Sequence, residues 1–265
     1  MKIRQLLVFF AAYILRNIPT HRIRKRFAKF VGPYFSGTIA KTAYGFPMIV
    51  HWYDNMNRIG FEGSYGIVAE FIENLPDNVL FIDIGANQGC TSILASKVLQ
   101  RKKNNNKGAV MAFEPSLSVF NLMQKNILLN KCTNIHTYNK AITFTHSELF
   151  LNEEDNNNSG ASHISNSGSK IYGSPLMTSD ILALGHYEDI YIKIDTEGYE
   201  MSVLNGIKDL FDSRLVRKVV IEIDNENLNK YGNNSKEVYK FFDKYDFNAT
   251  IGNKQGHYDE VFSKK

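Results

Sequence analysis

The chain is poor in cysteine. Among 265 residues only Cys90 and Cys132 occur. Neither forms a CxxC pair or has a histidine at metal-ligand spacing, which argues against a cysteine metal site. Both lie in apolar patterned segments, so we expect two reduced core thiols, which favours a cytosolic compartment.

Acidic residues are absent before Asp54. Residues 1–53 therefore carry about +9 and the remainder about −5, which together give the net charge of +4. The basic residues of this segment are Lys2, Arg4, Arg16, Arg22, Arg24, Lys25, Arg26, Lys29 and Lys41.

Long apolar runs are also missing, because the apolar stretch near the start is too short to span a bilayer. It resembles a signal peptide, but no small-residue cleavage site follows it. Five apolar residues share one helical face: Ile3, Leu7, Phe10, Ile14 and Ile18. Three interpretations stay open for residues 1–30: a helix lying in a membrane interface, a helix packed on the domain, or a nucleic-acid-binding arm.

A strand, a tight turn and a helix follow one another around Asp83. An apolar run ends in this acid, and Gly85, Asn87 and Gly89 lead into a helical pattern. In an α/β sheet the ligand binds at such a turn, where glycine lets the backbone approach it closely. A strand-end acid can accept hydrogen bonds from an ammonium group. The turn therefore suits the methionyl part of S-adenosylmethionine better than a pyrophosphate; the alternative is an ordinary strand-to-helix turn.

Alternating strands and helices predict an α/β fold with a mostly parallel, doubly wound sheet. With 43% hydrophobic residues the chain can bury one substantial core. We expect a basic helical extension over residues 1–75, including a helix at 67–75, and one domain over 76–265. The expected strands are 79–84, 109–113, 135–141, 190–194, 218–223, 249–251 and 259–263. The expected helices are 91–102, 118–129, 179–184, 199–210 and 235–245. Residues 104–108 and 152–170 are too polar for a core and are expected to form loops, the second of them with His163 at the rim of the site, and 149–151 suggest an edge strand.

Acids also end two further strands of the expected sheet. Glu114, followed by Pro115, ends the second strand, where an acid can reach the ribose hydroxyls of a nucleoside. Asp195 ends the fourth strand, at the same carboxyl edge as Asp83. The alternative for Glu114 is an exposed strand-end acid.

The block from Lys193 to Gly206 carries more charged residues. Glu197 and Glu200 fall in the first turn of a helix, where the helix dipole also favours acids on purely structural grounds. Lys193 sits on a buried strand, as a paired cation or a substrate contact. Glu222 lies in the next apolar strand, and strand adjacency suggests that it pairs with Lys193.

Taken together, these motifs resemble the FkbM family of S-adenosylmethionine-dependent methyltransferases. The resemblance covers about residues 79–245 and includes the segments 83–89, 113–115, 158–162 and 193–206. It implies a class I methyltransferase fold, with a seven-stranded, mostly parallel sheet and helices on both faces, and methyl transfer to a hydroxyl, often of a sugar or a polyketide. The family commonly has Gly-Asp after the third strand, where this chain has Ile142-Thr143, so no adenine-contacting aspartate is carried over.

The residues expected to bind the cofactor are Asp83, Gly85, Asn87, Gly89, Glu114, Pro115 and Asp195. Asp195 is the first candidate for the general base that a hydroxyl acceptor needs, and His163 is the second, because imidazole titrates near neutral pH. We expect Lys193 to assist catalysis, and Glu197, Glu200 and Glu222 to contact the acceptor. No metal is expected.

Two other functions compete with a sugar O-methyltransferase. The basic segment suggests a nucleic-acid methyltransferase, but no Asn-Pro-Pro-Tyr block that could hold a flipped base is present, so we expect no nucleic-acid partner. A methyltransferase-like scaffold without turnover is the non-enzymatic alternative. For the enzyme we expect a small-molecule or glycan acceptor and a cytoplasmic location, peripheral to the inner face of a membrane through residues 1–30.

Overall fold

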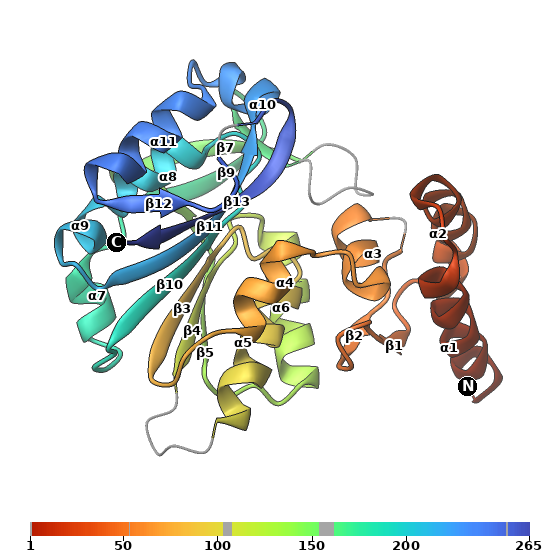
Figure 1. Ribbon diagram of the computed structural model, residues 1–265. Helices are drawn as coiled ribbons and strands as arrows, with labels where there is room; N and C mark the ends of the chain where they lie inside the picture. Colours follow the sequence, from red (N-terminus) through yellow and green to blue (C-terminus); the bar gives the residue numbers. More distant parts are fainter. Residues whose placement is uncertain (1, 53, 103–107, 154–161, 253) are drawn as a thin grey trace.

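A seven-stranded sheet forms the centre of the molecule (Figure 1). The computed structural model describes residues 2–52, 54–102, 108–153, 162–252 and 254–265. In sheet order the strands are β12 (Phe247–Ala249), β13 (His257–Lys264), β11 (Val216–Asp224), β10 (Asp189–Ile194), β3 (Val79–Ile84), β4 (Ala109–Phe113) and β5 (Ile135–Tyr138). Only β13 runs antiparallel to its neighbours. The expected mostly parallel sheet is confirmed.

Helices cover both faces of this sheet. Along β3, Val79 and Phe81 join the core on one face, whereas Leu80 and Ile82 join the core on the other. This alternation follows from the two-residue period of a strand, and each fully buried side chain of this size contributes about 1.5–3 kcal/mol. The helices on the first face are α4 (Ile67–Glu73), α5 (Cys90–Arg101) and α6 (Leu117–Leu129). Those on the second are α7 (Thr178–Leu182), α8 (Glu200–Gly206), α9 (Lys208–Asp212), α10 (Asn225–Lys230) and α11 (Ser235–Lys244).

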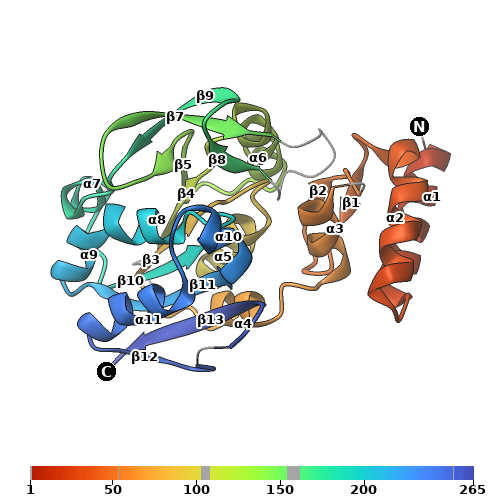
Figure 2. The same ribbon diagram turned by 90° about the horizontal axis from the view of Figure 1, so that it is seen from above.

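A second, four-stranded sheet lies beside the first (Figure 2). Its strands, in sheet order, are β6 (Ala141–Ile142), β9 (Ser169–Ser174), β7 (Ser147–Asn152) and β8 (His163–Ser165). The polar segment expected as a loop thus contains two strands, and β7 lies inside this sheet rather than at an edge. The expectation was wrong because these strands bury little: Ala141, Leu151 and Ile171 form a small core of their own. Residues 103–107 and 154–161, which hold most of the two expected loops and part of the 158–162 motif, lie outside the described residues.

The N-terminal region contains more than helices. It comprises α1 (Lys2–Asn17), α2 (His21–Phe35), the hairpin β1 (Ile39–Lys41) and β2 (Pro47–Ile49), and α3 (Asn55–Glu62). Trp52 is fully buried, with the rings of Phe35 and Phe61 at 5.9 and 5.5 Å. Arg58 pairs with Glu62 at 2.5 Å in the interior. Figures 1 and 2 both show α1 and α2 at the outer end of this region, far from the main sheet.

Some boundaries differ from those expected. The predicted strand 135–141 divides into β5 and β6, which belong to different sheets. The predicted helix 199–210 is two helices, α8 and α9, separated at Ile207. Among the described residues, none of the helices has both the length and the apolarity needed to cross a bilayer.

Candidate active site

The turn after β3 packs directly against the end of β10. Gly85 has φ +75°, and a Cβ built on it would lie 1.9 Å from the carbonyl oxygen of Asp195. Asn87 has φ +49°, a conformation that asparagine tolerates better than most residues. Gly89 has φ +85° and caps α5, with the side chain of Met123 against it. The glycines are therefore needed both for the turn and for the close approach of two backbones.

Asp83 lies beneath this turn and is fully buried. Its Oδ2 accepts hydrogen bonds from Thr91 Oγ1 at 2.7 Å and Ser92 Oγ at 2.6 Å. Its Oδ1 lies 3.3 Å from Lys193 Nζ. Asp83 does not line the pocket described below, so its direct contact with a ligand stays a prediction. In the structure, Asp83 is held by Thr91, Ser92 and Lys193, and these contacts support the turn.

Lys193 links the turn to the pocket. Its Nζ donates to the carbonyl oxygen of Gly85 at 2.7 Å and lies 3.3 Å from Asp195 Oδ2. Burial lowers the pKa of Lys193, but the charges of Asp195 and Asp83 more than offset this, so the pKa is raised and the ammonium stays charged.

The expected pairing of Lys193 with Glu222 is wrong. Glu222 Oε1 instead lies 2.8 Å from His257 Nε2 on β13. The prediction from strand adjacency failed because the Lys193 side chain contacts the neighbouring strand on the other side, β3. There Asp83 stands opposite Lys193 in the strand register. The hydrogen bond with Glu222 raises the pKa of His257 to about 9.

Both carboxylate oxygens of Glu114 are held by backbone amides. Oε2 accepts from the N–H of Asn87 and Oε1 from the N–H of Ser116, each at 2.9 Å. Burial raises the pKa of Glu114 to about 7, although these two hydrogen bonds lower it. The side chain therefore has a fixed orientation next to the glycine turn.

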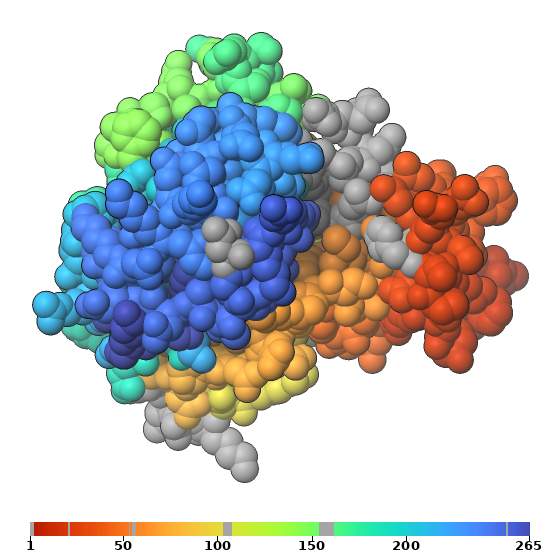
Figure 3. All heavy atoms as spheres, turned by 45° about the horizontal axis from the view of Figure 1, so that its top comes forward, coloured from red at the N-terminus to blue at the C-terminus, as the bar shows by residue number. Residues whose placement is uncertain are grey.

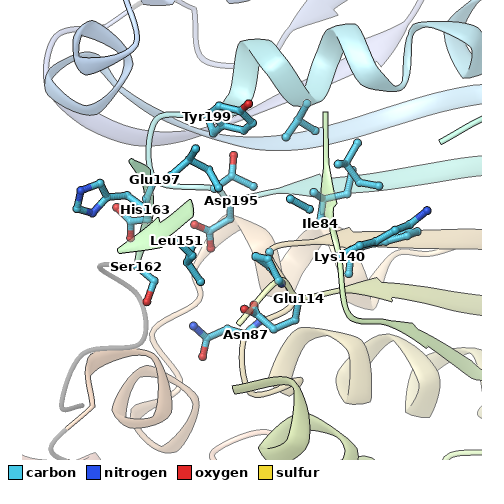
Figure 4. Close-up of a pocket in the computed structure, with 18 residues that line it drawn as sticks. Ile84, Asn87, Glu114, Lys140, Leu151, Ser162, His163, Asp195, Glu197 and Tyr199 are labelled. Carbon is cyan, nitrogen blue, oxygen red and sulfur yellow. The ribbon is translucent and has the colours of Figure 1, made fainter. Parts of the chain in front are cut away.

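An open pocket lies at the carboxyl edge of the main sheet, with about 690 Å³ of space between its walls (Figure 4). Apolar side chains form much of its wall, the carboxylates of Glu114, Asp195 and Glu197 also line it, and further lining residues come from β7 and β8 of the second sheet. The lining residues are Ile84, Gly85, Asn87, Phe113, Glu114, Pro115, Lys140, Ala141, Ile142, Leu151, Ser162, His163, Ile164, Asp195, Thr196, Glu197, Tyr199 and Val203.

Of the expected catalytic residues, Asp195 and His163 both line this pocket, and Lys193 lies just behind it. His163 begins strand β8 rather than lying in a loop. Figure 4 shows His163 on the same side of the pocket as Glu197.

The three acids expected to contact the acceptor lie in different surroundings. Glu197 lines the pocket and accepts from Asn227 Nδ2 at 3.0 Å; burial, followed by the charge of Asp195, raises its pKa to about 7. Glu200 is buried and its Oε1 accepts from the backbone N–H groups of Thr196 and Gly198, so it contributes by holding the loop. Glu222 stands outside the lining, beside His257.

Asp195, Glu197 and Glu222 offer carboxylate oxygens that all lie within 4.8 Å of one another. Three carboxylates at this spacing are able to hold a divalent cation. Burial and the charge of Asp195 raise the pKa of Glu222, which opposes three simultaneous charges. The expectation that no metal takes part stays a prediction.

Some lining residues were missed by sequence reasoning. Lys140 follows β5 at the same sheet edge as Glu114, and its Nζ donates to Ser174 Oγ at 2.8 Å. Its position near the carboxyl end of the expected strand 135–141 could have identified it as a pocket residue. Leu151 on β7 and Ser162, just before β8, come with the second sheet, whose place beside the pocket has no signal in the sequence. Ile142 lines the pocket where the family commonly has glycine before aspartate.

These residues fit S-adenosylmethionine. The apolar wall suits an adenine ring, the fixed carboxylate of Glu114 suits ribose hydroxyls, and the glycine turn lets the ligand approach the backbone closely. The fold and the site together define an S-adenosylmethionine-dependent methyltransferase. The sequence model described as "Methyltransferase FkbM domain" matches residues 83–249. The chain belongs to the FkbM methyltransferase family.

Solved structures of methyltransferases resemble the chain distantly. A methyltransferase FkbM from Methylobacillus flagellatus KT is 13% identical, with 95% of this chain and 58% of that chain covered and a TM-score of 0.45. A precorrin-6y C5,15-methyltransferase from Geobacter metallireducens GS-15 is 12% identical, with 77% and 89% covered and a TM-score of 0.45. An S-adenosylmethionine-dependent methyltransferase from Aquifex aeolicus is 15% identical, with 74% and 86% covered and a TM-score of 0.40. Among curated proteins, no sequence matches.

Proposed function

We propose that this enzyme transfers the methyl group of S-adenosylmethionine to a hydroxyl of a sugar or glycan acceptor. The observation that carries the proposal is the position of Asp195, which lines the pocket while Lys193 holds its carboxylate at 3.3 Å. Membership of the FkbM family supports a hydroxyl acceptor. Glu197, Tyr199 and Ser162 add polar groups able to hydrogen-bond a sugar.

The cofactor supplies an activated methyl group on a positively charged sulfur. In an in-line displacement the acceptor oxygen forms the new C–O bond as the C–S bond breaks, and S-adenosylhomocysteine leaves. Holding the two reactants in near-attack geometry is worth roughly 7–11 kcal/mol. Asp195 accepts the proton of the hydroxyl, and His163 is the second candidate for this base.

Lys193 acts as a positioning residue. Its ammonium is buried and reaches Asp83, Asp195 and the carbonyl oxygen of Gly85. It therefore couples the carboxylate that faces the acceptor to the turn that faces the cofactor. Asp83 supports the same turn from below.

We propose that the enzyme works in the cytoplasm at the inner face of a membrane. Residues 1–30 motivate this location, since they combine apolar and basic side chains. Lipid-linked glycan intermediates are then the acceptors that the enzyme would meet.

The test has two stages. Calorimetry first measures the binding of S-adenosylmethionine and S-adenosylhomocysteine to the full chain. The enzyme is then incubated with glycolipid and capsule extracts, and mass spectrometry searches for products heavier by one CH₂, with the Asp195→Asn variant as control. A product absent from the control supports the proposal. Cofactor binding without transfer to any glycan favours a scaffold, and transfer to RNA instead overturns the acceptor class.

A further inference from the structure

Helix α1 has two apolar faces, and packing accounts for only one of them. Val8, Ala11, Ala12 and Leu15 are buried in the core shared with the rest of the chain. On the other side Leu6 is 71% exposed and Phe10 is 62% exposed. A helix that merely packs on the domain would carry polar residues there.

The neighbouring helix α2 also exposes large apolar side chains. Phe30 is 75% exposed, and Ile23 and Tyr34 are exposed as well. The two helices are neighbours, and Arg4 on α1 donates to the carbonyl oxygen of Tyr34. More than half of the large, exposed apolar side chains among the described residues belong to these two helices, which form the outer end of the molecule in Figure 3. An apolar concentration of this kind marks an interaction surface.

Basic side chains surround this surface. Arg22, Arg26 and Lys29 are exposed on α2, and within the described ranges no carboxylate forms an ion pair with them. Arg16 and Arg24, in contrast, form hydrogen bonds within the N-terminal region, where they donate to backbone carbonyl groups. Three exposed positive charges therefore lie on the same helix as Phe30, and the sequence has no acid before Asp54 to balance them.

We propose that the exposed faces of α1 and α2 dock in the interface of an anionic lipid bilayer. Large aliphatic and aromatic residues mixed with Lys and Arg are the composition of a helix that lies in a membrane interface. A second copy of the chain would bring equal positive charges together, and a nucleic acid would leave Leu6 and its aliphatic neighbours without a partner. Neither helix lines the pocket, so docking leaves the active site open. The inference deepens the proposed location and does not depend on the acceptor.

The test measures co-sedimentation of the full chain with phosphatidylcholine vesicles that contain or lack phosphatidylglycerol, without cofactor or acceptor. Each basic residue near an anionic surface contributes about a fivefold gain in affinity. The R22Q/R26Q/K29Q variant is therefore expected to bind the anionic vesicles about a hundredfold more weakly. The L6Q/F10Q variant removes apolar contact and is expected to lose about tenfold or more.

A matched control is the L128Q/F144Q variant, which replaces two equally exposed apolar residues elsewhere on the surface. It is expected to bind vesicles like the unmodified chain. Binding of S-adenosylhomocysteine, measured on every variant, shows that each one is folded and separates this inference from the proposed function.

Several results would overturn the proposal: no association of the unmodified chain with anionic vesicles, or equal losses in the control variant. Light scattering that shows a dimer, dissociated by L6Q/F10Q, would identify a second copy as the occupant. Salt-sensitive RNA binding that R22Q/R26Q/K29Q abolishes, without vesicle binding, would identify a nucleic acid.

Discussion

The ammonium of Lys193, on β10, lies 3.3 Å from the Oδ2 of Asp195, the first residue after that strand. The acid that lines the pocket therefore has a buried counterion. Several predictions depend on this pair and on the turn above it.

Removing the cation is expected to destabilise the protein. In the Lys193→Met variant Asp83 is left as a buried charge without its counterion, a change that costs about 3–5 kcal/mol. Urea unfolding measures the loss. The double variant D83N/K193M removes both partners and is expected to lose less than the sum of the two single variants. Strictly additive losses would contradict the ion pair.

The glycine turn gives a second prediction with a matched control. Gly85→Ala places a methyl group 1.9 Å from the Asp195 carbonyl oxygen at φ +75°, whereas Gly232 has φ +73° with nothing within 4 Å. Both substitutions place a Cβ in the left-handed region, at a backbone cost of about 1–2 kcal/mol, but only G85A must also displace the backbone of Asp195 after β10. We expect G85A to abolish cofactor binding and G232A to leave it unchanged, as measured by calorimetry. Equal effects of G85A and G232A on cofactor binding would contradict the close approach of the Gly85 and Asp195 backbones.

Cofactor affinity is expected to depend on pH through Glu114. Burial raises the pKa of its carboxyl to about 7, so between its ordinary value and this one the folded state binds more protons than the unfolded state. The contribution of Glu114 to stability therefore falls as the pH rises through that range. The charged form accepts ribose hydroxyls better, so affinity should rise from about pH 6 to about pH 8.

The Glu114→Gln variant tests this assignment. It cannot titrate, and it retains one oxygen for the backbone amides. Calorimetry with S-adenosylhomocysteine across the same pH range should give a weak and nearly flat affinity profile. A profile as steep as that of the unmodified enzyme would assign the pH dependence to another group.

The two candidate bases can be separated by turnover. Asp195→Asn keeps the size of the side chain but not its basicity, and is expected to lower kcat by about 10²–10⁴ while cofactor affinity changes much less. His163→Asn is expected to have the smaller effect on kcat. A larger loss in H163N, with normal cofactor binding, would reverse the two roles.

We predict that turnover does not require a divalent cation. Burial and the charge of Asp195 raise the pKa of Glu197 to about 7, and Glu222 already holds His257, so three charged carboxylates are costly to assemble here. Activity after dialysis against a chelator should equal the starting activity. A loss that Mg²⁺ restores would make Asp195, Glu197 and Glu222 a metal site.

The central sheet could be predicted well from the sequence. The strands 79–84 and 109–113 are found with the predicted bounds, because continuous apolar runs that end in an acid are typical of buried parallel strands. The second sheet could not be predicted. Its strand β8 has only three residues and β9 is largely polar, and both are stabilised by pairing with β7 rather than by an apolar pattern.

The candidate site shows the same division. The shared carboxyl edge of parallel strands correctly brought Glu114 and Asp195 to one pocket. The sequence does not show which neighbouring strand a side chain contacts. For this reason Lys193 was predicted to pair with Glu222, whereas its partner is Asp83. The N-terminal helix was assigned one apolar face, because the periodicity of its sequence does not show that a second face packs against α3 and β1.

The pocket has walls from two separate sheets. Tyr231, at the end of α10, donates to the carbonyl oxygen of Ile164 in β8 at 2.7 Å, whereas the hydrogen bonds that hold Glu114 come from Asn87 and Ser116. Residues of β7 and β8 can thus change without altering the turn or Glu114. Sequence differences among relatives of this chain are expected to concentrate in that small sheet. Changes there can accommodate a new acceptor, while the glycine turn and Glu114, which suit the nucleoside, stay the same.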